Sequence, residues 1–412
     1  MLMAFRLLVV FRMSTLRFTL TILFTLFTSL VGLGLASPLS VERVSILTCG
    51  PGENVYELEG HTALRIQLTD GTDLSVNWGV FDFNSPNFLY RFVKGETDYR
   101  MAVYPFEYFY NQYRQEGRRV TERQINLDNE SKQRLLALID STLTQGSPVY
   151  RYNYVLDNCA TRPIAYLEMA TRAPIVLGKD TGISDSTSTF RADMAYYHRN
   201  YPWYQFGIDL ALGSGIDRVV IPREHIFAPV ALDRMLTDAY YVNEGEKIPL
   251  AGEPIEILPT THGGPQGPTP WYLTPMAVCW AFFIIAATIV VVDIKRRKVS
   301  RWFHCLYYSV ATLAALLLTF LIFVSVHEAT SPNWLFLWLN PLVIIGAVGI
   351  WLKKLNRTVN WWQIINFVAL IALAIIAACG VQRLNPAFWP LIMTDALLAI
   401  DWLTISYDKK DI

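Results

Sequence analysis

Residues 272–292 read YLTPMAVCWAFFIIAATIVVV, an apolar run without a charged side chain. About 20 apolar residues suffice to carry a helix across the hydrocarbon core of a bilayer. The sequence therefore predicts a membrane-spanning helix here. This run also divides the chain, because the residues before it are of mixed composition and those after it are mostly apolar.

Further apolar runs follow at about 303–326, 333–352, 362–381 and 387–406. Each is close to the length of one membrane span. The last run carries Asp395 and Asp401. Acidic groups inside a span are energetically costly and tend to mark function. Residues 271–406 are therefore expected to form an all-α bundle of about five transmembrane helices, with Asp395 as a candidate polar site within it.

Basic residues predict the orientation of this bundle, because loops rich in Lys and Arg stay in the cytoplasm. They follow the first, third and fifth runs: Lys295, Arg296, Arg297, Lys298, Arg301, Lys353, Lys354, Arg357, Lys409 and Lys410. The opposite side then holds residues 38–270 and the loop that carries His327. His327 is a candidate contact for a ligand at that surface, or an interfacial polar residue.

Residues 1–36 have the layout of a secretory signal peptide: arginines, an apolar run at 18–35, and the small residue Ala36 before Ser37. We expect cleavage near Ala36, and an uncleaved anchor is the alternative. Residues 37–242 would then form the exported domain. Residues 243–270, rich in Gly, Pro, Thr and Glu, are expected to be a linker to the membrane block.

The exported domain is predicted to be α+β. Expected strands are 44–48, 63–68, 74–81, 118–127 and 151–156, and expected helices are 105–115, 128–143 and about 159–170. Asp128 is expected to be the N-cap of the helix at 128–143, with Leu135, Leu138, Ile139 and Leu143 on its buried face. Over the whole chain Lys+Arg and Asp+Glu are equal, at 35 each. The chain therefore has no excess of positive charge that would indicate binding to nucleic acid.

Cys159 is predicted to lie in the first turn of a helix, after Asp157 and Asn158, which offer N-cap chemistry. Unpaired backbone N–H groups and the helix dipole stabilise a thiolate at such a position. The same groups can stabilise the oxyanion of an acyl-transfer intermediate. Cys159 is therefore a candidate nucleophile.

A thiol nucleophile needs a base, and His61 falls at the start of a predicted strand. His198, His225 and His262 fall in segments expected to be loops or linker. A competing interpretation is a structural disulfide between Cys49 and Cys159, as expected of an oxidising compartment. A metal site is not indicated, because no further His or Cys has ligand spacing with either residue.

Several segments are similar to the periplasmic domain of the Lnb family of lipoprotein N-acyltransferases. They are SILTCGPG at 45–52, GHTALR at 60–65, NWGVFDF at 77–83, DNCATR at 157–162 and GIDLALG at 207–213. The similarity extends to the multi-span C-terminal part. It implies a permuted papain-like (NlpC-type) exported domain, with the family's cysteine and histidine at Cys159 and His61.

The resemblance leaves the residue that orients His61 open. Asn77 is the first choice, and Asp82, expected opposite His61 in a simple hairpin register, is the second. Arg162 could steady a thiolate or a phosphate, or could be structural. Aromatic residues between positions 81 and 92 form either core or a gate for an acyl chain: Phe81, Phe83, Phe88, Tyr90 and Phe92.

The resemblance further implies an acyltransferase of the bacterial inner membrane, with its catalytic domain in the periplasm and no cofactor. The acyl donor would be a membrane phospholipid, and the acceptor the α-amine of a diacylglyceryl-cysteine lipoprotein. The alternatives are a papain-like cell-wall peptidase or amidase, and a non-catalytic membrane assembly protein with a Cys49–Cys159 disulfide.

Overall fold

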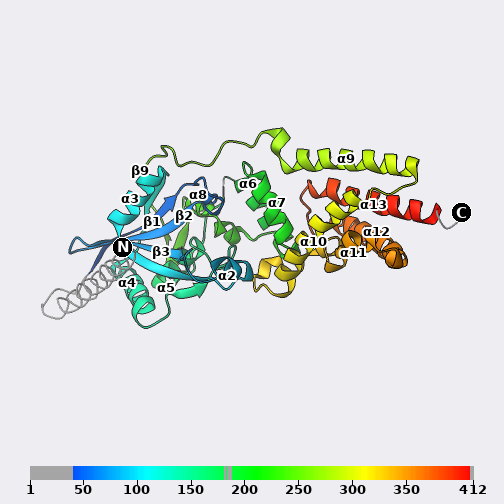
Figure 1. The fold of residues 1–412 in the computed structure, drawn as a ribbon. Helices are drawn as coiled ribbons and strands as arrows, with labels where there is room; N and C mark the ends of the chain where they lie inside the picture. The colour runs from blue at the N-terminus through cyan, green and yellow to red at the C-terminus, as the bar shows by residue number, and fades with distance from the viewer. Residues whose placement is uncertain (1–39, 181, 183–187, 409–412) are drawn as a thin grey trace, which may run out of the picture.

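The computed structural model describes residues 40–180, 182 and 188–408 of the 412-residue chain (Figure 1). An α+β domain precedes a block of long helices, which confirms the predicted fold class. The predicted signal peptide at 1–36, together with Lys409 and Lys410, lies outside the described residues.

A seven-stranded antiparallel sheet forms the centre of the exported domain, in the order β6-β4-β3-β2-β1-β5-β9. Its strands are β1 Val41–Cys49, β2 His61–Leu68, β3 Asp73–Val80, β4 Asp98–Pro105, β5 Val120–Gln124, β6 Val149–Arg151 and β9 Ile255–Leu258. A separate hairpin consists of β7 Tyr240–Asn243 and β8 Glu246–Pro249. The predicted hairpin at 63–81 is confirmed as β2 and β3.

Helices cover both faces of the sheet. Helix α3 Phe106–Glu116 covers one face, and α4 Asn129–Thr144, α5 Thr161–Thr171 and α8 Pro229–Met235 cover the other. The other helices of the domain are α2 Phe88–Lys94, α6 Phe190–Tyr197 and α7 Pro202–Ala211. Successive side chains of a strand point to opposite faces. In β1, Ile46 therefore packs with the core that α4, α5 and α8 cover, whereas Leu47 packs with α3.

Three local predictions were wrong. The segment 151–156 is not a strand, because β6 ends at Arg151 and turns follow it. Residues 243–270 are not only a linker, since β8 lies within them and β9 pairs with β5 to form an edge of the sheet. Leu143, expected on the buried face of α4, is exposed, although Asp128 caps this helix as predicted by accepting from the N–H of Ser131.

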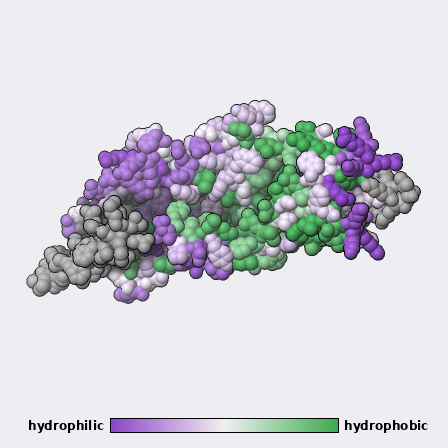
Figure 2. Space-filling view, viewed as in Figure 1, coloured by the Kyte–Doolittle hydropathy of each residue, from purple (hydrophilic) through white to green (hydrophobic). Residues whose placement is uncertain are grey.

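The described residues contain five candidate membrane spans, as predicted. They are Pro275–Arg296 (α9), Arg301–Phe323 (α10), Trp334–Trp351, Lys353–Ala378 (which contains α12, Asn356–Ala378) and Phe388–Ser406 within α13, Phe388–Asp408. The third span is not one regular helix. Its only α-helical turn is α11, Ile344–Val348, because Asn340 and Pro341 restart the helix in the middle of the span. Figure 2 shows the apolar surface of this block.

Asp395 is buried in this block and bonds to three other spans. It accepts from the Tyr308 hydroxyl at 3.0 Å, from Asn366 Nδ2 at 2.8 Å and from Trp338 Nε1 at 3.1 Å. Paired polar groups of this kind are how membrane proteins tolerate a carboxyl group at depth. Asp395 thus connects α13 to α10, to the third span and to α12.

Candidate active site

The loop between β6 and α5 carries Cys159, and Asn158 shapes it. Asn158 Oδ1 accepts from the N–H groups of Ala160, at 2.8 Å, and Thr161, at 3.1 Å. Its carbonyl accepts from the N–H of Arg162 at 3.1 Å, the first bond with helical spacing. These bonds shape the turn that leads into α5, which begins at Thr161 with Ala160 as its N-cap. Cys159 therefore lies in this turn, two residues before the helix, and not in the first helical turn as predicted.

The amide nitrogen of Asn158 holds the same loop from the other side. Nδ2 donates to the carbonyls of Tyr154 and Phe227, both at 2.8 Å. Asn158 is fully enclosed and uses both ends of its side chain in this way. Asn158 therefore has a structural role: it holds the loop that carries Cys159.

The thiol of Cys159 is buried, with 7% of the residue exposed. Burial raises the pKa of Cys159 above its usual value. The backbone N–H of Thr62, the hydroxyl of Tyr152 and the N–H of Cys159 itself oppose this rise. Cys159 is therefore a neutral thiol at rest, and it requires a base to become nucleophilic.

His61 is the first residue of β2 and pairs with Asn77 on β3. Its Nε2 atom lies 3.2 Å from Asn77 Oδ1, while Asn77 Nδ2 donates to Ser75 Oγ at 3.4 Å. This assignment of the amide makes Oδ1 the acceptor, so His61 Nε2 carries the proton and Nδ1 is the basic nitrogen. Burial lowers the pKa of His61 to about 4, although the Asn77 bond opposes that shift. His61 is therefore neutral near pH 7.

The structure brings Cys159 beside the strand that carries His61. Within the described part of the chain, no hydrogen bond joins the thiol of Cys159 to the imidazole of His61. The thiol instead interacts with the backbone N–H of Thr62, the residue after His61. Gly79, with φ +83°, lets β3 pass close by, because a Cβ there would lie 3.0 Å from the Tyr152 ring and 3.8 Å from the Cβ of Cys159.

The other predicted site residues lie apart from the thiol. Asp82 follows the end of β3 and is exposed, and its carboxylate accepts from the N–H of Asn84 at 2.8 Å. The prediction that Asp82 lies opposite His61 was wrong, because the β2–β3 register pairs Ala63 with Asn77. Asn77 is the residue that this register brings to the histidine.

Arg162 and His327 both make structural contacts. Arg162 forms a two-point ion pair with Asp157, at 2.5 and 2.6 Å, and lies over the ring of Tyr150 at 3.9 Å. His327 Nε2 donates to the carbonyl of Phe92 at 2.9 Å, which joins the loop after α10 to α2.

Sequence reasoning missed Tyr152, whose hydroxyl lies 3.9 Å from the sulfur of Cys159. A tyrosine in a segment expected to be a strand carries no local signal of this contact.

The prediction that His198 lies in a loop-like segment also missed its role. His198 is fully buried at the end of α6, and its Nε2 atom lies 2.6 Å from a carboxylate oxygen of Glu59, two residues before His61.

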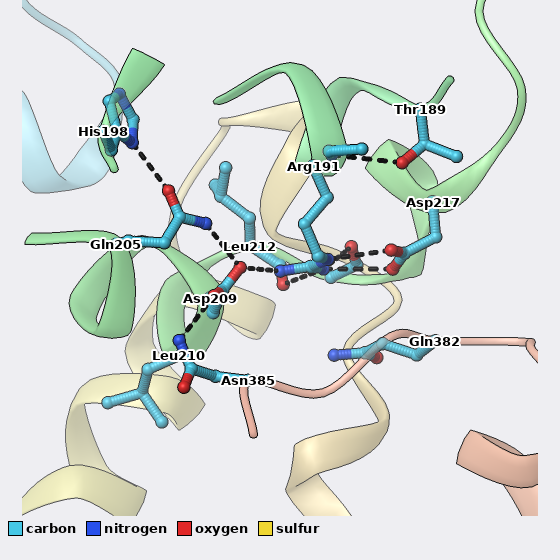
Figure 3. A network of polar contacts seen from close by, with 12 residues as sticks. Thr189, Arg191, His198, Gln205, Asp209, Leu210, Leu212, Asp217, Gln382 and Asn385 are labelled. Carbon is cyan, nitrogen blue, oxygen red and sulfur yellow. Dashed lines mark hydrogen bonds and ion pairs between the residues drawn. The ribbon is translucent and has the colours of Figure 1, made fainter. Parts of the chain in front are cut away.

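A chain of polar contacts runs from His198 to the membrane block (Figure 3). His198 Nδ1 donates to Gln205 Oε1 at 2.7 Å, and Gln205 Nε2 donates to Asp209 at 2.9 Å. Asp209 also accepts from Arg191, at 2.8 Å, and from Asn385 between α12 and α13, at 2.8 Å. Glu59 and the loop between α12 and α13 are therefore connected through hydrogen bonds.

Cys49 lies directly across from His61 in the β1–β2 pair, on the face that α3 covers. Both Cys49 and Cys159 are free. Burial raises the pKa of Cys49 to about 12, against the effects of Arg118 and Tyr113. The described residues contain no group of three or more His, Cys, Asp or Glu side chains placed to hold a metal ion.

Fold and site together define a multi-pass membrane protein whose exported α+β domain holds a buried thiol close to the strand that begins with a neutral histidine. Residues 36–191 match the model of the Lnb N-terminal periplasmic domain, and residues 268–410 match that of the Lnb transmembrane domain. The chain belongs to the Lnb family, which is related to lipoprotein N-acylation. No curated protein and no solved structure matches the chain.

Proposed function

We propose that this protein is a lipoprotein N-acyltransferase that uses Cys159 as nucleophile and His61 as general base. The observation that carries the proposal is the position of the thiol in the turn just before α5, beside β2, where Asn77 of β3 holds His61. Family membership supports the same reaction class. Permuted papain-like enzymes combine a thiol and an imidazole in this manner.

In the first half-reaction, the sulfur of Cys159 attacks an ester carbonyl of a membrane phospholipid. His61 Nδ1 takes the thiol proton and gives it to the departing glycerol oxygen. A C–S bond forms and a C–O bond breaks. The products are a thioester on Cys159 and a lysophospholipid.

In the second half-reaction, the free α-amine of a lipoprotein's S-diacylglyceryl cysteine attacks the thioester. A C–N bond forms, the C–S bond breaks, and His61 accepts the proton that the amine loses. His61 must be unprotonated each time it receives a proton, and burial keeps it in that form near pH 7. The product is a triacylated lipoprotein, and the thiol is restored.

Anchoring in the membrane fits these substrates. Both are lipids held in the bilayer, and five candidate spans keep the catalytic domain at the same surface. Confinement raises the effective concentration of enzyme and substrate. Such anchoring favours a lipid substrate over the cell-wall polymer, which lies outside the bilayer.

The test is intact-protein mass spectrometry of the purified full chain, incubated with a defined phospholipid and no acceptor. The expected result is one acyl adduct on Cys159 that hydroxylamine removes and that Cys159→Ser abolishes. Adding a diacylated lipoprotein should discharge the adduct and add one amide-linked acyl chain to that lipoprotein. Amide transfer without any adduct on Cys159 would contradict the covalent mechanism, and cleavage of a peptide instead would favour the peptidase.

A further inference from the structure

Five aromatic rings form a continuous row on the exported domain, which we call the aromatic row. Its members are Phe92, Phe88, Phe81, Tyr99 and Tyr152. Neighbouring ring centroids along it are separated by 5.8, 5.7, 5.1 and 4.6 Å. The rings come from α2, from the end of β3, from β4 and from the loop after β6, so only the tertiary structure assembles them.

The inner end of the aromatic row reaches the candidate nucleophile. The ring of Tyr152 stacks on Tyr99, and its hydroxyl lies 3.9 Å from the sulfur of Cys159. Gly79 leaves room for the Tyr152 ring at this point, because a Cβ there would approach the ring to 3.0 Å. The row therefore ends at the thiol itself.

The outer end of the aromatic row lies at the boundary of the membrane block. The N–H of Val326 donates to the carbonyl of Lys94 at 2.8 Å, and His327 donates to Phe92 at 2.9 Å. The ring of Tyr90 lies 5.9 Å from that of Phe320. Phe320 belongs to α10, a candidate span whose end at Phe323 faces the exported domain. These contacts place α2 where the second span leaves the bilayer (Figure 1).

Helix α2 exposes apolar side chains instead of burying them. No residue of α2 is fully buried, and Leu89 is 73% exposed. Tyr90, Phe92 and the nearby Phe83 are also exposed. Figure 2 shows hydrophobic surface that continues from the membrane helices onto this part of the exported domain. An apolar patch joined to a membrane span is expected to contact lipid.

We propose that the aromatic row is the path of the phospholipid acyl chain: the chain leaves the bilayer at α2 and lies along the rings, with its ester carbonyl at Cys159. This inference rests on the proposed function, because it assumes a lipid donor that reacts at Cys159. Each methylene that moves from water onto the rings favours binding by about fourfold. The row therefore selects donors with long chains.

The first test compares donors of different chain length. Phe88→Ala interrupts the row at its centre, and Tyr108→Ala is a matched control, because Tyr108 is 71% exposed on α3, far from the membrane helices (Figure 1). Each full-length variant is incubated with sixteen-carbon or six-carbon phosphatidylcholine in detergent, and the rate of adduct formation on Cys159 is measured. Thermal unfolding verifies that both variants are folded.

We expect Phe88→Ala to lower the rate with the long-chain donor by about tenfold or more and the rate with the short-chain donor by less than about twofold. Tyr108→Ala should change neither rate. Equal effects of Phe88→Ala on both donors, or no effect on either, would overturn the proposed path. If wild-type protein forms no adduct with either donor, the proposed function fails instead, and the second test then decides the path.

The second test needs no turnover. Cys159→Ala protein in lipid nanodiscs is irradiated with a phosphatidylcholine that carries a diazirine near the end of one acyl chain, and cross-linked peptides are mapped. Cross-links at residues 81–92 and 99 support the path. Cross-links confined to the membrane spans refute it. If only a photoreactive diacylated lipoprotein labels the aromatic row, the row binds the acceptor and not the donor. That result would also refute the proposal.

Discussion

The Nε2 atom of His61 lies 3.2 Å from the Oδ1 atom of Asn77 on the neighbouring strand. This bond fixes the proton on Nε2 and leaves Nδ1 free to accept the thiol proton. His61→Ala should lower adduct formation on Cys159 by ~10²–10⁴-fold, the usual contribution of a positioned base. Asn77→Ala should lower it by only about tenfold, because the imidazole remains but is no longer oriented.

The Asn77→Asp variant tests whether Asn77 orients the imidazole of His61 or only supports the fold. A carboxylate beside Nε2–H would favour the imidazolium and raise the pKa of His61. The acid limb of the rate profile should then move to higher pH, whereas Asn77→Ala should not move it upward. Single-turnover rates between pH 4 and 9 provide the measurement, and an unchanged limb in Asn77→Asp would show that Asn77 does not act on the imidazole.

The pH dependence of the wild-type protein follows from the lowered pKa of His61. Because burial lowers this pKa from 6.5 to about 4, the imidazole stays neutral as the pH falls through 6.5 and becomes protonated only near pH 4. The rate of adduct formation should therefore persist to about pH 5. A fall centred at pH 6.5 would show that His61 titrates as a solvated histidine.

The two periplasmic cysteines are expected to differ. Cys159→Ser should abolish the adduct, whereas Cys49→Ala should retain most activity and fold, because Cys49 packs against α3 and burial raises its pKa to about 12. Labelling of denatured protein with a maleimide, without reductant, should report both thiols as free. Loss of folded protein in both variants together with no label would favour the structural disulfide.

The contact between Asp209 and Asn385 should hold the two parts of the chain together. Asn385 Nδ2 donates to Asp209, while Asn385 Oδ1 accepts from the N–H of Ala387 at 3.0 Å. Asn385→Asp keeps the second bond but places a carboxylate against Asp209. We expect a loss of about 1–3 kcal/mol in the free energy of unfolding, and faster hydrogen exchange in α7. Gln115→Glu, at an exposed position on α3 away from this contact, serves as a control for added charge.

Asp395 should stabilise the membrane block rather than the reaction. Asp395→Leu removes the acceptor for three buried donors and should lower the thermal midpoint in detergent clearly. Asp395→Asn keeps one acceptor oxygen for two of the donors, so its effect should be smaller. The rate of adduct formation per folded molecule should stay within about twofold in both variants, and a large loss in Asp395→Asn would instead indicate a functional role.

The sequence by itself determined the parts of this protein that depend on local composition. Runs of apolar residues identified all five spans, because a bilayer imposes the same length on every helix that crosses it. Alternating residues and turn signals identified the β2–β3 hairpin, and Asp128 marked the start of α4. These features depend only on residues that are close together in the sequence.

Tertiary structure decided which residues meet at the site. The choice of Asn77 over Asp82 depended on the register of β2 and β3, and a shift of one residue in register reverses the face on which a side chain lies. Strand β9 looked like linker because its partner, β5, lies far away in the sequence. The stacking of Tyr152 on Tyr99, the Glu59–His198 contact and the rest of the aromatic row all join distant segments, and no local pattern encodes such packing.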